Sequence, residues 1–398
     1  MQTIAVVSVG RSDYGILLPV LRAIQAEPGL RLQLIAAGTH LAPAFGETVR
    51  VMESDGWTVA ARVDCRLGAD APQAIAASMG AAVQGFAEAY ADLRPDIVLV
   101  TGDRFEQHAA AVASVPFALP LAHLHGGEAT EGAIDNVLRY AITMMSHLHF
   151  VATDEARQRL EQMGEAPWRI TVSGAPALDN LQALRWLDAP ALERLIGLPL
   201  APAPLLATYH PVTLEYDQAD AQIQELLAAL ESAGRPVVFT GSNADTSHRV
   251  IRRRIEAFVS RQPQARLVPS LGVEAYFSLM RHAAAMVGNS SSGLIEAPSF
   301  GLPVVNVGTR QQGRLRAGNV IDVACRREEI AAGLARATDP AFRLTLRGLR
   351  NPYGDGQAAG RIVAALKRTE RTDALLRKRW TPARIAPASP QLAGTHAH

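Results

Sequence analysis

Short apolar runs rich in β-branched residues alternate with longer helical patterns along this chain, and each run ends in a short polar segment. Residues 4–9, 96–101 and 119–124 are such runs in the first half. Residues 205–208 and 284–287 continue the rhythm in the second half. Strands this apolar, each followed by a helix, are typical of a parallel sheet covered on both faces. We therefore predict an α/β fold built from doubly wound sheets.

The length favours two domains. The chain has 398 residues, and a domain typically takes roughly 100–200. Four prolines fall between Pro190 and Pro204, which is typical of a linker region. We predict two Rossmann-like domains, residues 1–188 and 189–370, that face a central cleft, followed by a helix end and a loose tail over residues 371–398.

Composition narrows the possible partners and location. The net charge is +1, so no bulk field favours nucleic acid or a membrane surface as a partner. No apolar run reaches the roughly 18 residues needed to span a bilayer, and the N-terminus lacks a signal-peptide pattern. Cys65 and Cys325 lie in separate halves, as expected for reduced thiols in a cytoplasmic protein. Only Lys367 and Lys378 are lysines, so any cation in an earlier site must be Arg or protonated His.

Ligands of doubly wound sheets bind beyond the carboxyl ends of the strands. Any one polar residue at such an end can be a simple helix cap. Ser12 and Asp13, which follow the first strand, are examples. Their convergence at one cleft is what indicates a ligand site. The polar residues at these ends are Arg11, Asp103, Glu128, His210, Asn243, Ser290, Ser291 and Ser292.

The segment from Gly288 to Gly293 follows a strand and opens a helix predicted over residues 294–300. Free N–H groups at a helix start, small residues and serine hydroxyls together suit a phosphate. Glu296 lies about one turn into that helix and could accept hydrogen bonds from ribose hydroxyls. A serine cap without a ligand would explain the same pattern, and no P-loop or dinucleotide fingerprint is present.

A dense ionisable stretch runs from His123 to Arg139. His123 and His125 alternate on a strand and could share a face, as zinc ligands do, but neither a His-Glu-x-x-His motif nor a cysteine pair lies nearby. Carboxylates gathered in one cleft can instead have divergent pKa values and act as acid and base. Asp103, Glu128 and Asp135 are the candidates, and we predict neither a metal nor a cofactor.

The same residues resemble a known family, the hydrolysing UDP-N-acetylglucosamine 2-epimerases. The resemblance runs in order from residue 4 to about residue 323. Its motifs are Gly10-Arg-Ser-Asp-Tyr14, Thr101-Gly-Asp-Arg-Phe-Glu106, His123-Leu-His-Gly-Gly-Glu128, Arg139-Tyr-Ala-Ile-Thr143, Ser146-His-Leu-His-Phe150, His210-Pro-Val-Thr213, Gly288-Asn-Ser-Ser-Ser292 and Gly308-Thr-Arg-Gln-Gln-Gly-Arg314.

The resemblance implies a GT-B-like fold with the nucleotide mainly on the C-terminal domain. It implies release of UDP from UDP-N-acetylglucosamine or a related sugar, such as a 2,4-diacetamido-trideoxy sugar, and formation of the free sugar inverted at C2. Such products are precursors of sialic or legionaminic acids. Elimination to a glycal and hydration need a base, an acid and positive charge at the leaving phosphate, but no cofactor. The resemblance also implies that the chain forms a homodimer or homotetramer.

The resemblance also implies roles for individual residues. Asp103, Glu128 and Asp135 would do the acid–base work, with His125 as a further candidate because some members carry Glu at that position. The expected ligand contacts are Arg11, His210 and Arg314 at the pyrophosphate, Ser290, Ser291 and Ser292 at its oxygens, Glu296 at the ribose, Asn243 at the uracil pocket, and Arg104 and Arg139 elsewhere in the cleft.

Two residues depart from the family's usual Arg-His-Ala-Ile-Thr-Lys motif: Tyr140 replaces the His and Met144 replaces the Lys. The change could be drift on a helix, a less polar sugar pocket, or loss of activity. Three other functions remain open at this point. They are a non-hydrolysing 2-epimerase that returns the UDP-linked epimer, a glycosyltransferase with an acceptor, and a catalytically inactive protein that binds nucleotide sugars.

Overall fold

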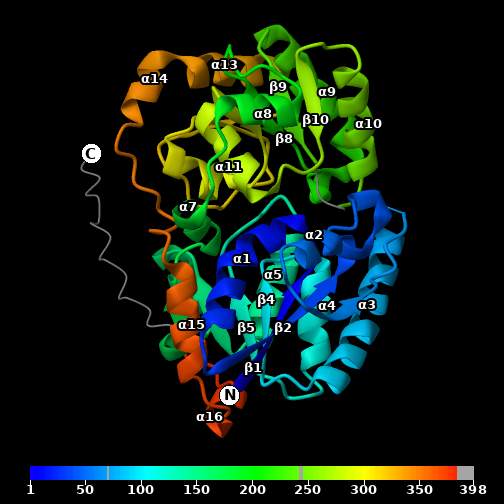
Figure 1. Ribbon diagram of the computed structural model, residues 1–398, viewed down its shortest axis with the longest axis vertical. Coiled ribbons are helices and arrows are strands. Elements are labelled where there is room, and N and C mark those ends of the chain that lie inside the picture. Colours follow the sequence, from blue (N-terminus) through cyan, green and yellow to red (C-terminus); the bar gives the residue numbers. More distant parts are fainter. Residues whose placement is uncertain (70, 242–244, 383–398) are drawn as a thin grey trace, which may run out of the picture.

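The computed structural model describes residues 1–69, 71–241 and 245–382, which form two α/β domains joined at one side (Figure 1). Asn243 and residues 383–398 of the predicted tail lie outside the described residues. No helix in the described part of the chain is long and apolar enough to cross a membrane.

The N-terminal sheet, within the described residues, has seven parallel strands in the order β3-β2-β1-β4-β5-β6-β7. The strands are β1 (Gln2–Ser8), β2 (Leu30–Ala37), β3 (Val59–Val63), β4 (Ile97–Thr101), β5 (Leu121–Leu124), β6 (Leu148–Val151) and β7 (Ile170–Val172). The helices of this part are α1 (Arg11–Ala26), α2 (Val49–Ser54), α3 (Pro72–Leu93), α4 (Phe105–Ser114), α5 (Asp135–Met145) and α6 (Asp154–Gln162).

The C-terminal sheet has six parallel strands among the residues described, in the order β10-β9-β8-β11-β12-β13. The strands are β8 (Leu205–Thr208), β9 (Val237–Thr240), β10 (Ala265–Val268), β11 (Ala285–Gly288), β12 (Val304–Val307) and β13 (Val320–Val323). The helices from the linker onward are α7 (Asn180–Ala183), α8 (Ala189–Ile196), α9 (Ala219–Ala233), α10 (His248–Val259), α11 (Gly272–His282), α12 (Ser292–Ile295), α13 (Arg327–Thr338), α14 (Pro340–Thr345), α15 (Ala358–Arg368) and α16 (Asp373–Leu376).

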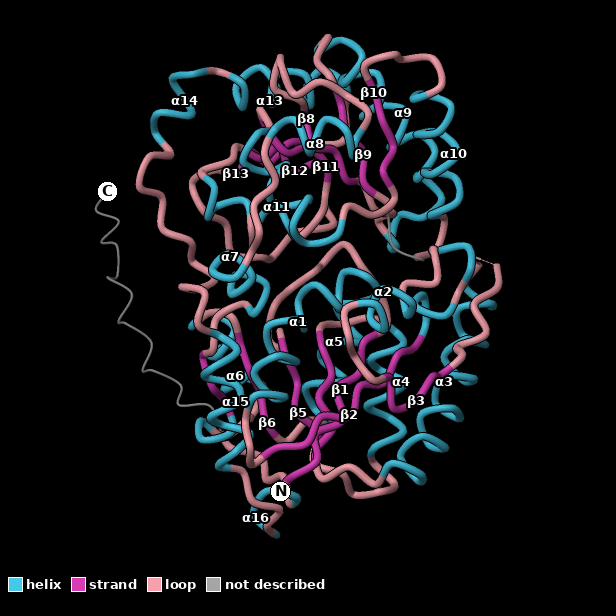
Figure 2. The backbone as a smooth tube through the Cα atoms, viewed as in Figure 1, coloured by secondary structure: helices cyan, strands magenta, loops and turns pink. Residues whose placement is uncertain are grey.

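Burial of both faces of β1 explains why helices cover both faces of the first sheet. Ile4 and Val6 pack into one apolar cluster with residues of α1, whereas Ala5 and Val7 pack into another with residues of α3 and α4. Successive strand side chains point to opposite faces, so an entirely apolar strand needs a layer on each. The predicted GT-B-like architecture of two doubly wound domains is confirmed (Figure 2).

The chain crosses between the domains a second time near Tyr353, whose carbonyl accepts a hydrogen bond of 2.7 Å from the Ala175 N–H of the first crossing. Helix α15 then packs against α1, and its Ile362 and Leu366 join the core of the N-terminal sheet. Helix α15 lies within residues 189–370, the predicted second domain. Its apolar face nevertheless packs against α1 of the N-terminal domain.

Candidate active site between the two domains

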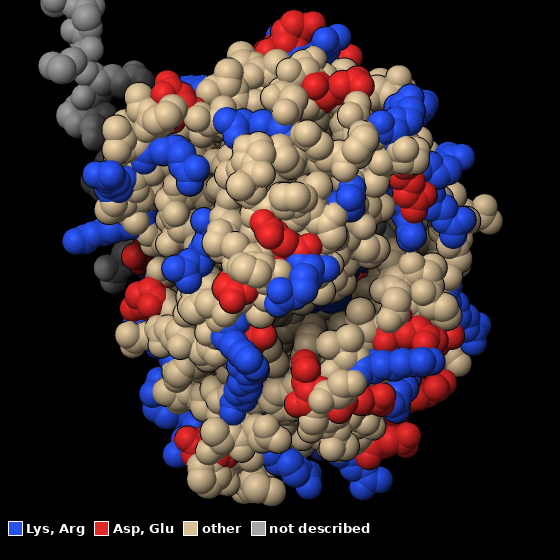
Figure 3. Space-filling view, turned by 45° about the horizontal axis from the view of Figure 1, so that its top comes forward, with Lys and Arg blue, Asp and Glu red and all other residues tan. Residues whose placement is uncertain are grey.

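A cavity of about 650 Å³ lies at the carboxyl ends of the strands and is lined by both domains. Figure 3 shows a hollow between the two lobes with acidic and basic side chains near its rim. Of the residues that the sequence predicted, the cavity lining includes Arg11, Asp103, Arg104, His125, Glu128, Arg139, His210, Ser290, Ser291, Ser292, Glu296 and Arg314. The convergence expected from the strand ends is therefore present.

Asp103 follows β4 and forms an ion pair with Arg139 of α5. Arg139 is 1% exposed, and its Nη1 donates a 2.6 Å hydrogen bond to the His125 carbonyl. Burial opposes ionisation of Asp103, but the charges of Arg139, Arg314 and Arg310 outweigh it and hold the pKa of this carboxyl below its ordinary value. Asp103 is therefore a carboxylate, fixed in direction by a buried cation.

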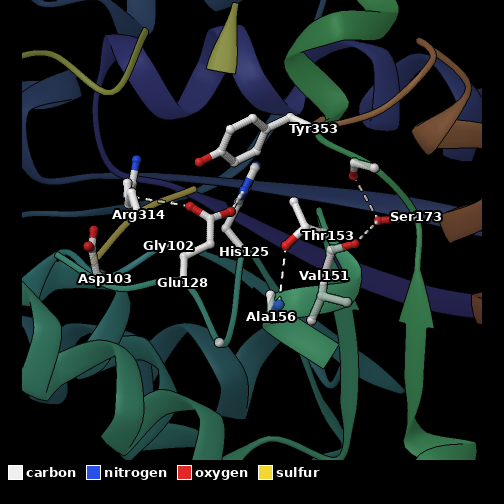
Figure 4. Close-up of polar contacts among 12 residues, drawn as sticks. Gly102, Asp103, His125, Glu128, Val151, Thr153, Ala156, Ser173, Arg314 and Tyr353 are labelled. Carbon is white, nitrogen blue, oxygen red and sulfur yellow. Dashed lines mark hydrogen bonds and ion pairs between the residues drawn. The ribbon is translucent and has the colours of Figure 1, made fainter. Parts of the chain in front are cut away.

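Glu128 lies between His125 and Arg314 (Figure 4). His125 Nδ1 is 2.6 Å from Glu128 Oε1, and Arg314 Nη2 is 3.2 Å from Glu128 Oε2. Arg314 follows β12 and also donates from Nε to the Ala129 carbonyl at 3.0 Å. Arg314, which the sequence placed at the pyrophosphate, thus pairs across the cleft with Glu128 of the other domain.

His123 and His125 do not share a face. The strand β5 ends at Leu124, and His125 has a left-handed backbone with φ of 61°. His123 turns inward instead, and its Nε2 donates a 2.7 Å hydrogen bond to the Gly102 carbonyl. Among the residues of the described ranges, no group of three or more His, Cys, Asp or Glu side chains could hold a metal ion.

Asp135 is the predicted acid–base residue that does not line the cavity. It is the first residue of α5 and is only partly exposed. Burial, and then the negative charges of Asp103 and Asp245, raise the pKa of Asp135 to about 7. Near neutral pH this carboxyl can therefore hold a proton that Asp103 does not.

This raised pKa predicts how stability depends on pH. The folded state keeps the Asp135 proton to a higher pH than the unfolded state does, so stability falls as pH rises from the ordinary Asp pKa to about 7. Asp135→Asn has no proton to lose there. Its free energy of unfolding by urea, relative to wild type, should therefore be higher at about pH 8 than at about pH 5. A relative gain at the acidic pH would contradict the assignment, and Asp92→Asn on the exposed end of α3 is the control.

The C-terminal wall is built around Gly288, at the end of β11. A Cβ there would lie 1.9 Å from the Thr208 carbonyl oxygen, and φ is 127°, so glycine alone lets β8 and the serine loop approach this closely. The predicted helix over residues 294–300 is instead two short pieces, α12 and a 3₁₀ helix over Ala297–Phe300. Pro298 lacks the N–H that a continuous helix would use.

Glu296 also lines the C-terminal wall of the cavity. It is 8% exposed, and its Oε2 has no hydrogen-bond partner among the described residues. Burial raises its pKa to about 7. A buried acceptor without a partner is costly, and a ligand hydroxyl would satisfy it.

His210 is fixed at the end of β8 by Asn289. The Asn289 side chain accepts from the His210 N–H at 2.7 Å and donates to its carbonyl at 2.8 Å. Burial, followed by the charges of Arg310, Arg104 and Arg11, holds the pKa of His210 well below its ordinary value. His210 is therefore neutral in this cleft, and the positive charge expected from it comes from the arginines.

The cavity also contains residues that the sequence did not single out. Arg310 lines the cavity and donates a 3.0 Å hydrogen bond to the Asn289 carbonyl. Its position within the Gly308–Arg314 motif could have identified it as a site residue. Asp13, considered as a helix cap, is buried and accepts from Gln107 Nε2 at 2.9 Å instead. The loop before α11 and Tyr276 on that helix also line the cavity, but no sequence motif marked them as site residues.

Tyr140 and Met144 lie outside the cavity lining, so neither side chain contacts the cavity directly, as a residue of the predicted sugar pocket would. Met144 is 45% exposed, near the end of α5. Lys378 reaches this helix end from the C-terminal segment, and its Nζ donates to the Met144 carbonyl at 2.9 Å. It also pairs with the buried Glu165. One of only two lysines thus provides a cation at the helix C-terminus, where the macrodipole favours it.

Lys378→Met should lower the free energy of unfolding by about 3 kcal/mol, because it leaves the Glu165 carboxylate buried without its ammonium partner. Urea denaturation at neutral pH measures the change. Lys367→Met is the matched control: Lys367 pairs with Glu27 in an exposed pair, and such pairs contribute at most about 1 kcal/mol. Equal losses in the two variants would show that the Lys378 contact is no more than a surface pair.

Comparisons with known proteins show which family the chain belongs to. The profile of the UDP-N-acetylglucosamine 2-epimerase family matches residues 22–367. The chain is 37% identical over 321 residues to the GDP/UDP-N,N′-diacetylbacillosamine 2-epimerase (hydrolyzing) of Campylobacter jejuni, covering 80% of this chain and 83% of that protein. It is 34% identical over 358 residues to the UDP-N,N′-diacetylbacillosamine 2-epimerase (hydrolyzing) of Legionella pneumophila, covering 90% and 93%.

Among solved structures, the UDP-GlcNAc 2-epimerase of Neisseria meningitidis bound to UDP-GlcNAc superposes with a TM-score of 0.79. The match covers 93% of this chain and all of that one at 18% identity, and it supports the fold alone. The family profile and the two sequence relatives extend over most of the chain. The chain belongs to the UDP-N-acetylglucosamine 2-epimerase family.

Proposed function

We propose that the protein is a hydrolysing 2-epimerase that converts a UDP-linked 2-acetamido sugar to UDP and the free sugar inverted at C2. The observation that carries this proposal is one cavity with carboxylates and an imidazole from the first domain and hydroxyls, arginines and Glu296 from the second. The names of the Campylobacter and Legionella relatives favour a 2,4-diacetamido sugar as the substrate.

The nucleotide half of the substrate would lie on the C-terminal wall. Ser290, Ser291 and Ser292 offer hydroxyls to the phosphates, and Arg11 and Arg310 offer positive charge. Glu296 would accept hydrogen bonds from the ribose, which would satisfy its unpartnered Oε2. Such groups stabilise the charge that develops on a departing diphosphate.

The sugar would lie against the N-terminal wall. In the first step the C2–H bond breaks, its electrons form the C1=C2 bond, and UDP leaves with the electron pair of the C1–O bond. In the second step the glycal takes a proton at C2 on the opposite face and hydroxide from water at C1. One base and one acid are therefore needed, and this wall carries Asp103 and Glu128 as carboxylates beside the protonatable Asp135.

We further propose that the enzyme works in the cytoplasm as a homodimer or homotetramer and supplies precursors of sialic- or legionaminic-type acids. The relatives named as diacetylbacillosamine epimerases and an Escherichia coli polysialic acid biosynthesis protein, 32% identical over 369 residues, support the precursor role.

A panel of UDP- and GDP-linked 2-acetamido and 2,4-diacetamido sugars tests the proposal. Release of free UDP with turnover, fastest for a UDP-linked 2,4-diacetamido sugar, is the expected result. A preference for GDP-linked sugars would contradict the nucleotide assignment. A nucleotide-linked epimer as the end product would identify a non-hydrolysing epimerase, and tight binding without turnover would identify an inactive binding protein.

A further inference from the structure

We propose that His125 Nε2 is the atom that removes the C2 proton, and that Glu128 orients His125 rather than transferring the proton itself. This inference rests on the proposed function. Some members of the family carry Glu at the position of His125, so this chain would use an imidazole where those members have a carboxylate.

The tautomer of His125 follows from its contact with Glu128. His125 Nδ1 lies 2.6 Å from Glu128 Oε1, and the two residues are each 5% exposed. An ionised carboxylate only accepts hydrogen bonds, so a proton on Nδ1 faces Glu128, and in the neutral ring this leaves Nε2 with a free electron pair. Nε2 is buried, has no hydrogen-bond partner among the described residues, and belongs to a residue that lines the cavity.

Glu128 itself is poorly placed to take a proton. Its Oε1 is engaged by His125, and Arg314 Nη2 faces its Oε2 at 3.2 Å. Burial opposes ionisation, but the contacts of Glu128 with His125 and Arg314 prevail and hold the pKa of Glu128 well below its ordinary value. A carboxylate with so low a pKa is a weak base. It is well suited to stabilise an imidazolium beside it.

The backbone holds His125 in this orientation from both sides. Its N–H donates to the Phe150 carbonyl at 3.0 Å, and its carbonyl accepts from Arg139 Nη1 at 2.6 Å. Its φ of 61° is in the left-handed region, which non-glycine residues seldom adopt. Such strain persists where the surroundings enforce it, often at functional sites. Here it turns the ring away from His123 and toward Glu128.

The proton balance closes with the groups present. In the elimination, Nε2 takes the C2 proton and becomes an imidazolium paired with the Glu128 carboxylate, while UDP leaves with the C1–O electrons. In the hydration, a carboxyl on the opposite face protonates C2, water gives hydroxide to C1, and the remaining water proton restores that carboxyl. Asp103 lines the cavity and is the carboxyl that would act, after taking the proton that the neighbouring Asp135 still holds near neutral pH. The imidazolium proton leaves to solvent with UDP.

His125→Gly tests the proposal, because glycine accepts the left-handed backbone and leaves space for added imidazole. We expect kcat to fall by about a hundredfold or more while the Kd for UDP changes less than about twofold. Added imidazole should restore at least about tenfold of the lost rate, with a pH profile that follows imidazole protonation. His125→Glu should restore activity without imidazole, with its pH optimum shifted to lower pH.

Ala118→Gly is the matched control, since Ala118 also has a left-handed φ, 49°, and lies outside the cavity. It should show wild-type kcat with or without imidazole. The proposal is overturned if His125→Gly keeps more than about a tenth of the wild-type kcat, or if neither imidazole nor His125→Glu raises its rate. Failure of wild type to release UDP from any sugar would instead contradict the proposed function.

Discussion

Replacing Asp103 by asparagine is expected to lower kcat by about a thousandfold while leaving the Kd for UDP within about twofold of wild type. The carboxylate lines the N-terminal wall of the cavity, where we propose that the sugar lies, and Arg139, Arg314 and Arg310 keep it ionised. The amide has nearly the same shape but can neither hold the charge nor exchange the proton. Steady-state kinetics and calorimetric titration with UDP give the two numbers.

Asp92→Asn makes the same chemical change on the exposed end of α3 and should leave both numbers unchanged. A near-wild-type kcat for Asp103→Asn would remove this residue from the chemistry. A large loss of UDP affinity would instead place Asp103 at the nucleotide.

Arg139→Met should lower the free energy of unfolding by about 4 kcal/mol, because it leaves buried partners without their cation. Arg139 is 1% exposed, pairs with Asp103, and donates to the His125 carbonyl at 2.6 Å. Methionine fills similar space without a donor. Chemical denaturation at neutral pH measures the loss, which is a large fraction of the stability of an ordinary domain.

Arg254→Met is the control for this prediction, since Arg254 pairs with Asp220 on the surface and such pairs contribute about 1 kcal/mol or less. Combining Arg139→Met with Asp103→Asn should cost less than the sum of the two single changes, because the second change removes the charge that the first leaves buried. Additive losses would mean that the two side chains do not stabilise each other.

Strand ends were the part of the site that the sequence predicted well. The apolar runs located the strands that carry Asp103, His210 and the serine loop, and the topology of a parallel sheet brings such ends together whatever their distance in the chain. Pairing of charges within the cleft could not be predicted this way. Whether Arg314 meets a ligand or Glu128 depends on how the two domains approach each other.

The errors have similar physical causes. The predicted helix over residues 294–300 is interrupted at Glu296, because Pro298 in the next turn cannot donate the hydrogen bond of a continuous helix, a local signal that the prediction overlooked. Tyr140 and Met144 sit on a helix beside the site, but a motif does not reveal which helix face meets the cavity. The contact of Lys378 with α5 joins residues more than two hundred positions apart, and sequence spacing carries no information about it.

The most direct test of the central claim is proton NMR of the reaction run in D2O with the UDP-linked sugar that turns over fastest. Removal of the C2 proton, elimination of UDP and hydration predict one equivalent of free UDP and a free sugar that is inverted at C2 and carries deuterium there. A UDP-linked epimer, or a free sugar that keeps its original C2 proton, would contradict the account.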